Sequence, residues 1–338
     1  MNRPNGTDLS CAKPCTEPQG TGQLRSRAPA REHLRCPRCS SPVRQSGPDL
    51  ECEGCLSRYP IVAGVPILID ESESIFSISD FLQHRPTYFQ QESKSRRVAK
   101  DVLPSISNNP RAKQNYATFL ANLPRRVERR ARVLIVGGGI AGEGSHELLT
   151  NPEIELVESD VSLAPRTTLV CDAHSVPFPD GYFDGVVAQA VLEHVLDPQR
   201  CVAEFHRVLA PDGLVYAETP FCLQVHGRQY DFTRYTRLGH RRLFRGFAEI
   251  GAGPCGGPGM ALAWCCQYFL LSWLKSSWAR NAARVFSRLG LFWLKYLDLI
   301  LMDEPGALDA ASGFYFLGRK SATVLSDRDL LRLYRGGE

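Results

Sequence analysis

The stretch that decides the fold is residues 170–221, VCDAHSVPFPDGYFDGVVAQAVLEHVLDPQRCVAEFHRVLAPDGLVYAETPF. In order, it predicts a strand, a turn, a strand, a helix and a strand. Two prolines and an Asp-Gly pair within 177–181 supply turn chemistry. Residues 183–188 are a buried-looking strand, and apolar residues recur at helical spacing over 191–209. Alternating strands and helices predict a parallel sheet, in which ligands bind beyond the carboxyl ends of the strands.

This run resembles the type 11 branch of the class I S-adenosylmethionine (SAM) methyltransferases. The resembling residues are Asp172-Ala173, Val176-Pro177-Phe178, Phe183-Asp184, Leu192-Glu193-His194 and the segment RVLAPDG at 207–213. The resemblance implies a Rossmann-like α/β sheet with helices on both faces, and an enzyme that transfers a methyl group from SAM (EC 2.1.1.-). The long ordered run argues against the rival enzyme, a dinucleotide-dependent oxidoreductase. A non-catalytic scaffold protein is the other alternative.

Four cysteines form two C-x-x-C pairs, Cys36 with Cys39 and Cys52 with Cys55. Four thiolates suit tetrahedral Zn²⁺ in a closed structural site, whereas two unrelated reduced pairs would need no metal. The run YPIVAGVPILI at 59–69 completes a resemblance to Trm112-like zinc ribbons, small structural proteins of which some support methyltransferases. We therefore expect a zinc ribbon at 34–70. We also expect SAM binding to survive loss of the zinc, because the methyltransferase domain would have its own core.

A strand followed by glycines, ARVLIVGGG at 131–139, lies ahead of this run. Glycine lets the backbone approach a ligand closely, although a plain structural turn would look the same. The resemblance implies that the turn passes under the methionine part of SAM. Gly137 and Gly139 match the first two glycines of the family's G-x-G-x-G, while Ala141 stands at the third position.

The remaining cofactor candidates follow the next three strands. The resemblance implies a carboxylate that accepts hydrogen bonds from both ribose hydroxyls. Asp160 fits the family's D-(I/V)-S pattern, and Glu158 competes with it; a solvent-exposed turn acid is the alternative for either. Asp172 would accept from the adenine amino group, with the Ala173 backbone N–H facing the ring. Gln189 and Ala190, at the end of the fourth strand, would line the cofactor and substrate side.

The acceptor side is expected beyond the fourth and fifth strands. Glu193 and His194 are expected to open a helix, where Glu suits the positive end of the dipole; His194 is a candidate for direct chemistry or for positioning. Residues 219–244 resemble a segment found in a subset of type 11 enzymes, and His226 and Asp231 are candidates for proton removal. The alternative is an Asp–Arg pair that only holds the loop. Methyl transfer needs alignment first, so a base is not obligatory.

Residues 260–302 form an apolar segment that holds all four tryptophans. Its apolar run is shorter than the ~20 residues needed to span a bilayer. We expect a helical insertion that covers the active site. The alternative is peripheral contact with a membrane, because Lys and Arg interleave with the aromatic residues. Both interpretations favour a lipid-like or large acceptor; sugar and small-molecule acceptors stay open.

The composition sets the remaining limits. A net charge of +4 argues against a nucleic-acid partner, and the basic run at 125–132 is expected to be a solvated helix face. The polar residues 1–33 lack the apolar core of a signal peptide, so we expect a disordered leader and a cytoplasmic protein, or one at a membrane surface. No motif indicates an oligomeric state. The other expected parts are a helical connector at 71–112, the methyltransferase domain at 113–325 and a tail at 326–338.

Overall fold

The computed structural model describes residues 31–85 and 103–337. The leader expected at 1–33 therefore lies outside the described residues, except for a 3₁₀ turn, η1 (Arg31–His33). Part of the expected connector, residues 86–102, lies outside them as well. The described part of the connector contains one short helix, α1 (Ile78–Leu82), and the next helix, α3 (Ala112–Asn122), begins where the connector was expected to end.

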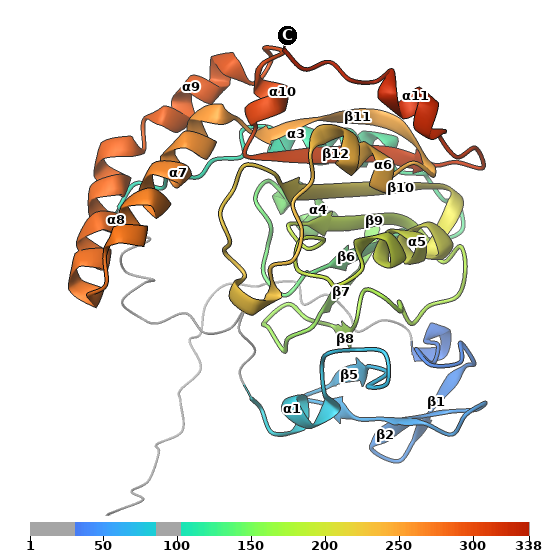
Figure 1. The fold of residues 1–338 in the computed structure, drawn as a ribbon. Helices are drawn as coiled ribbons and strands as arrows, with labels where there is room; N and C mark the ends of the chain where they lie inside the picture. The colour runs from blue at the N-terminus through green and yellow to red at the C-terminus, as the bar shows by residue number, and fades with distance from the viewer. Residues whose placement is uncertain (1–30, 86–102, 338) are drawn as a thin grey trace, which may run out of the picture.

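Within the described residues, nine strands form one sheet in the order β11-β12-β10-β9-β6-β7-β8-β5-β4 (Figure 1). The strands are β4 (Ile61–Val62), β5 (Val65–Leu68), β6 (Ala131–Val136), β7 (Ile154–Asp160), β8 (Leu169–Cys171), β9 (Phe183–Gln189), β10 (Leu209–Pro220), β11 (Phe247–Gly256) and β12 (Gly313–Lys320). From β5 to β10 all neighbours are parallel, and β12 runs antiparallel between β10 and β11. The predicted Rossmann-like sheet is confirmed.

Helices cover both faces of the sheet. One face packs against α3 and α4 (His146–Thr150), and the other against α5 (Pro198–Val208). Successive side chains of a strand point to opposite faces. In β9, accordingly, Val186 belongs to the core under α5 and Val187 to the core under α3. Burial on both faces explains why the central strands read as continuous apolar runs.

The cysteine module extends this sheet. Its own three-stranded sheet consists of β1 (Val43–Ser46), β2 (Asp49–Cys52) and β3 (Arg58–Tyr59). The chain then continues through β4 into β5, which pairs in parallel with β8. Buried module residues such as Leu34 and Leu50 belong to the same hydrophobic cluster as Phe178 and Phe205. The expectation of two separate cores was therefore wrong, because the module supplies both a strand and apolar side chains to the larger domain.

Two local predictions were wrong for identifiable reasons. The basic run at 125–132 is not helical; Arg126 Nε and Arg129 Nη1 instead contact the buried carboxylate of Asp184 at 2.6 and 2.5 Å. The helix expected from residue 191 begins only at Pro198, because Asp197 caps it by accepting from the backbone N–H of Arg200. The Glu193-His194 pair consequently lies in a loop, away from any helix N-terminus.

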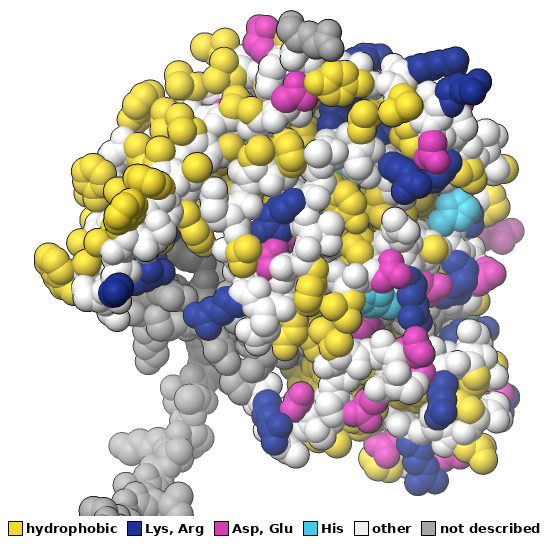
Figure 2. All heavy atoms as spheres, in the orientation of Figure 1, with side chains coloured by type: hydrophobic (Ala, Val, Ile, Leu, Met, Phe, Trp, Pro, Cys, Tyr) yellow, Lys and Arg dark blue, Asp and Glu magenta, His cyan; other side chains and the backbone are white. Residues whose placement is uncertain are grey.

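The apolar segment forms three helices, α7 (Pro258–Trp273), α8 (Ser277–Leu291) and α9 (Leu294–Leu301), which lie to one side of the sheet (Figure 1). Hydrophobic side chains gather on their outer surface at the upper left of Figure 2. Trp273 is 74% exposed and Trp278 is 81% exposed. No helix within the described residues is long and apolar enough to cross a membrane. Short helices α10 (Ala307–Ala310) and α11 (Asp327–Leu331) follow, the latter within the expected tail.

Candidate cofactor and acceptor sites

A cavity of about 870 Å³ opens at the carboxyl ends of β6, β7 and β8. This is where the topology of a parallel sheet predicts a ligand. Among the predicted residues, its lining includes Gly137, Asp160, Asp172, Ala173 and His194. The other predicted cofactor residues, Gly139, Glu158 and Gln189, are not part of the lining.

The glycine turn after β6 lies against the end of β7. Gly137 has a φ of +71°, and a Cβ atom there would come within 2.6 Å of the Val191 side chain. The N–H of Gly139 donates to Asp160 Oδ2 at 3.0 Å, and a Cβ atom on Gly139 would lie 2.7 Å from that same oxygen. Glycine is thus required at both positions, the first for its backbone conformation and the second for close approach to Asp160.

The two competing carboxylates of β7 differ in their surroundings. Asp160 lines the cavity and also accepts from Ser162 Oγ at 2.8 Å. Burial raises the pKa of Asp160, while the hydrogen bonds from Ser162 and Gly139 oppose that rise. Glu158 is buried away from the cavity and forms an ion pair with Arg166 at 2.7 Å. Of the two, Asp160 is the carboxylate placed to meet a ligand.

Asp172, at the end of β8, is held from both sides. His174 contacts Oδ1 through its backbone N–H at 3.0 Å and through Nδ1 at 2.5 Å, and Ser74 Oγ donates to Oδ2 at 2.5 Å. Although burial opposes ionisation, these contacts hold the pKa of Asp172 below its usual value. A carboxylate has about four acceptor sites, so Asp172 retains capacity for a ligand.

The segment after β5 forms part of the cavity wall through Glu73, Ile75 and Phe76. This contribution was not predicted from the sequence. The run at 59–69 predicts a strand, but only its parallel pairing with β8 brings the end of that strand to the edge of the sheet where the larger cavity lies. The residues that directly follow the cysteine module in the sequence therefore form part of the cavity wall.

A smaller cavity of about 160 Å³ lies beyond β9 and β10. Its lining includes Glu193, Glu218, Thr219 and His226. Ala190 lines both cavities, in a left-handed backbone conformation with φ of +55°. The two cavities thus adjoin each other at Ala190.

Glu218, which sequence analysis missed, is the most heavily hydrogen-bonded carboxylate of the smaller cavity. It accepts from Asn109 Nδ2 at 2.9 Å, from Gln189 Nε2 at 2.9 Å and from the hydroxyl of Tyr216. Its burial raises its pKa. The amide nitrogen of Gln189 donates hydrogen bonds to Glu218 and to the Glu143 carbonyl. These bonds explain why Gln189 does not line the cofactor cavity as predicted.

The three predicted catalytic residues gather in one loop region, but with different roles. His194 Nδ1 donates to the Tyr230 carbonyl at 2.6 Å, and the rings of His194 and His226 are 5.0 Å apart. Burial opposes protonation of His226, yet the carboxylates of Glu193 and Asp231 raise its pKa. Asp231 accepts from the N–H groups of His226 and Gly227 and forms an ion pair with Arg234.

These contacts give Asp231 a structural role. Although burial opposes ionisation, Arg234 and the two backbone N–H groups hold its pKa well below the usual range. A carboxylate held ionised in this way is a poor proton acceptor. The contacts therefore favour the Asp–Arg pair that holds the loop over a base at Asp231.

An apolar groove of about 820 Å³ separates this loop from α7. Its lining includes Phe221, Val225 and Phe232 on the loop side, with Leu262 and Tyr268 on the helix. The Tyr268 hydroxyl donates to the Val225 carbonyl at 3.0 Å and joins the two sides. Of the apolar segment, α7 therefore lines a groove next to this loop, whereas α8 and α9 leave large apolar side chains exposed.

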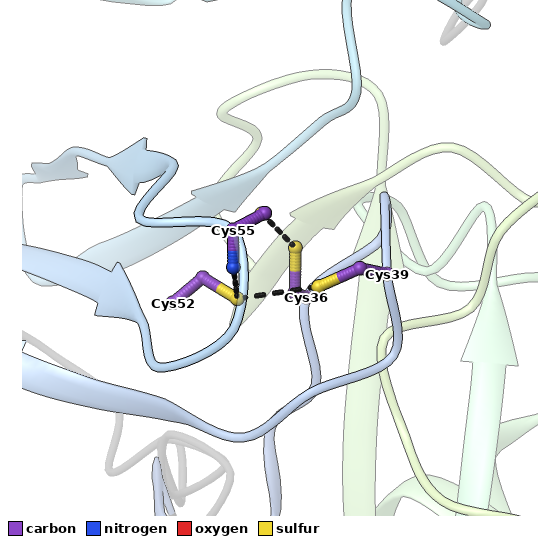
Figure 3. Close-up of side chains that lie close together, drawn as sticks. All are labelled: Cys36, Cys39, Cys52 and Cys55. Atoms are coloured by element: carbon purple, nitrogen blue, oxygen red, sulfur yellow. Dashed lines mark hydrogen bonds between the residues drawn. The ribbon is translucent and has the colours of Figure 1, made fainter.

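The four cysteines of the module converge as their spacing predicts (Figure 3). Cys36 Sγ lies 3.6 Å from Cys55 Sγ, and Cys39 Sγ lies 3.4 Å from Cys52 Sγ. Four sulfurs at 2.3 Å from a tetrahedral Zn²⁺ would lie about 3.8 Å apart. The N–H groups of Gly54 and Cys55 donate to Cys52 Sγ, an arrangement that stabilises a thiolate. The residues present fit a structural zinc ion.

Comparison with known proteins agrees with the sheet. Residues 143–217 match the family described as a methyltransferase domain. The ubiquinone/menaquinone biosynthesis C-methyltransferase of Paraburkholderia phymatum is 46% identical over 46 residues, which are 14% of this chain and 19% of that protein. Its counterpart in Bordetella avium is 48% identical over 44 residues, 13% of this chain and 17% of that protein. The chain thus matches less than a fifth of the length of these curated relatives.

Among solved structures, one match is phosphoethanolamine N-methyltransferase 2 of Haemonchus contortus with S-adenosyl-L-methionine, at 18% identity and a TM-score of 0.41. That match covers 76% of this chain and 62% of the other. A second is the complex of the Haloferax volcanii Trm112 methyltransferase activator with a methyltransferase, at 17% identity and a TM-score of 0.38, covering 68% of this chain and 95% of the other. The match to the methyltransferase domain family is thus confined to residues 143–217 of this chain.

Proposed function

We propose that the protein is a SAM-dependent methyltransferase. The observation that carries the proposal is Asp160, which lines the larger cavity at the carboxyl end of β7 and is braced by the Gly139 amide. The glycine turn would hold the methionine part of SAM and Asp160 its ribose, while Asp172 and the Ala173 amide would hold its adenine. SAM supplies an activated methyl group; the chain aligns it with the acceptor and excludes water.

The acceptor is proposed to bind in the smaller cavity. Proton removal, where the acceptor requires it, falls to the groups that line this cavity, among them Glu193, Glu218 and His226. His194, which lines the larger cavity and is fixed by the Tyr230 carbonyl, positions the reacting groups. Asp231 is proposed to hold the loop rather than to react.

A lipid-like acceptor is favoured by the surfaces next to this site. The groove between the loop and α7 is mostly apolar, and α8 and α9 expose large apolar side chains close by. The basic residues of the segment include Lys275, Arg280 and Arg288, which would meet an anionic surface favourably. The relatives matched in sequence are named for ubiquinone and menaquinone biosynthesis. We propose peripheral membrane contact through α7–α9.

Zinc is proposed as a structural ion held by Cys36, Cys39, Cys52 and Cys55. All four positions would be filled by protein, so this ion would have no open position for catalysis. Its contribution would be to fold the module, and through β5 to complete the wall of the larger cavity.

Calorimetry of the purified chain tests the proposal. We expect binding of SAM and of its demethylated product, and no binding of NAD. Binding of NAD with no response to SAM would favour the oxidoreductase alternative. A chain that binds neither, while its thermal unfolding remains cooperative, would favour a scaffold protein.

A further inference from the structure

Three side chains converge where the two cavities meet: Glu193, His194 and His226. Glu193 Oε1 lies 3.8 Å from His194 Nε2 and 3.7 Å from His226 Nε2. The ligand atoms of all three lie within 4.8 Å of one another. None of these residues belongs to the cysteine module.

Glu193 is the unusual member of this cluster. Its side chain is buried, neither carboxylate oxygen has a hydrogen-bond partner among the described residues, and its contacts with the two Nε2 atoms are longer than a hydrogen bond. Buried polar groups nearly always have a partner, and buried charges are paired or coordinate metals. The helix-dipole explanation expected from the sequence does not apply, because α5 begins four residues after His194. The carboxylate thus indicates a cation site between Glu193 and the two histidine rings.

The two histidines are oriented as metal ligands usually are. His194 Nδ1 donates to the Tyr230 carbonyl at 2.6 Å. His226 Nδ1 donates to the Gln224 carbonyl at 3.3 Å and lies 3.5 Å from Asp231 Oδ2. In both rings Nδ1 is hydrogen-bonded to a backbone carbonyl, and Nε2 faces Glu193. Metal-binding histidines almost always anchor their second nitrogen in this way, which fixes the ring and its tautomer.

We propose that Glu193, His194 and His226 bind one divalent transition-metal ion. Ligands at 2.0–2.2 Å from a tetrahedral ion lie about 3.4 Å apart, so the observed 3.7 and 3.8 Å require only a small closure around the ion. Two imidazoles and one carboxylate suit Zn²⁺, Fe²⁺ or Co²⁺ better than Mg²⁺ or Ca²⁺. Three protein ligands leave positions open, as in catalytic rather than structural sites.

The location assigns the ion a role at the acceptor. Glu193 and His226 line the smaller cavity together with Glu218 and Thr219, while His194 lines the cofactor cavity. An ion held by these three residues would bind an oxygen of the acceptor, such as a hydroxyl or an enolic oxygen, and hold it in register with the methyl donor. This role depends on the proposed function, whereas binding of the ion does not.

Cobalt titration of the full-length chain loaded with only one zinc ion per molecule tests the proposal. We expect one Co²⁺ to bind in addition to the zinc, with visible d–d absorption and without the thiolate-to-cobalt charge-transfer band that a cysteine site would give. Glu193→Gln and His226→Ala should each weaken this binding at least tenfold. The matched control is His146→Ala, an exposed histidine in α4, which should change nothing.

Each other outcome counts against the site. A zinc-loaded chain that takes up no second ion overturns the proposal without recourse to any variant. Cobalt binding that Glu193→Gln and His226→Ala leave unchanged places the ion elsewhere. SAM calorimetry on the same samples separates the two proposals: retained SAM binding without cobalt binding rejects the metal site alone, and the reverse rejects the proposed function alone.

Discussion

The hydroxyl of Ser74 donates a 2.5 Å hydrogen bond to the carboxylate of Asp172, although 98 residues separate them in the chain. Ser74 follows the last strand of the cysteine module, and Asp172 directly follows strand β8 at the larger cavity. This bond joins the wall supplied by the module to a residue proposed to hold adenine.

Replacing Ser74 should therefore weaken SAM binding. We expect Ser74→Ala to cost about 1 kcal/mol of binding free energy, a several-fold rise in Kd, because Asp172 loses one of the donors that orient it. Isothermal titration calorimetry measures the change. The exposed Ser72, whose hydroxyl donates to Asp70 within the same turn, provides the control variant Ser72→Ala. An equal effect of both substitutions would show that the segment acts only through its general fold.

Removing zinc should weaken SAM binding too, contrary to the expectation from the sequence alone. Strand β5 and residues 73–76 reach the cavity from the cysteine module, so unfolding the module opens the cavity wall. We expect Cys52→Ser, or a strong chelator, to lower both zinc content and SAM affinity. Cys265→Ser, which changes an exposed cysteine of α7, is the control. Normal SAM binding by the metal-free chain would instead show that the cysteine module and the methyltransferase domain are independent units.

Asp160 should be the carboxylate that binds the ribose. We expect Asp160→Ala to weaken SAM binding by about 1.5–3 kcal/mol, roughly ten- to a hundredfold, through loss of charge-assisted hydrogen bonds. Glu158→Gln should have a much smaller effect on binding, because Glu158 contacts Arg166 outside the cavity. The assignment fails if calorimetry shows the larger loss at position 158.

Asp184 should make the fold sensitive to acid. Although burial opposes its ionisation, hydrogen bonds from Arg129, the Arg132 amide and Arg126 lower its pKa. A lowered carboxyl pKa stabilises the fold above the unfolded-state value of about 4, and this stability is lost as the pH falls through the folded-state value.

Urea unfolding across pH 3–7 checks this prediction. Asp184→Asn should lower the free energy of unfolding by about 1.5–3 kcal/mol at pH 7 and flatten its decline in acid. Asp212→Asn, at a half-exposed partner of Arg126, should cost less. A variant that loses stability equally at pH 3 and pH 7 would show that packing, and not charge, is responsible.

The apolar helices should bind anionic vesicles. Trp273 and Trp278 are largely exposed and lie beside Lys275 and Arg280, so vesicle co-sedimentation should detect binding that high salt weakens. Replacing both tryptophans with Ser should reduce it strongly. Leu331→Ser alters an equally exposed apolar residue in α11 and should not. Absence of vesicle binding, together with tryptophan fluorescence that responds to SAM, would favour a lid.

The sequence predicted the sheet and the cysteine cluster well because both depend on local patterns. Turn residues, strand runs and C-x-x-C spacing all lie within short windows. It failed where contacts between distant segments decide the outcome. The sequence around Arg126 does not indicate that Asp184 is its partner, and the sequence around Asp172 does not indicate that Ser74 donates to it. Gln189 sits at the predicted end of β9, yet its side chain turns to Glu218, a choice set by the neighbouring strand.

The start of helix α5 shows a different kind of error. Apolar spacing continues smoothly from residue 191, but Asp197 and Pro198 form a stronger initiation signal than periodicity does. Giving the cap precedence would have placed Glu193 and His194 in a loop. Their meeting with His226 could still not have been predicted, since it depends on how the loop after β10 folds back.

The pairing of β5 with β8 also changes what the protein depends on. A strand supplied by a separate polypeptide would cover β8 only in those molecules that had bound this partner. Here the covering strand is tethered, with an effective concentration on the order of millimolar, so coverage of the β8 edge is insensitive to the amounts of other proteins. An uncovered edge strand is a template for aggregation. With zinc folding the module as proposed, the supply of zinc, rather than the expression of a partner protein, would then decide how much of this protein escapes aggregation in the cell.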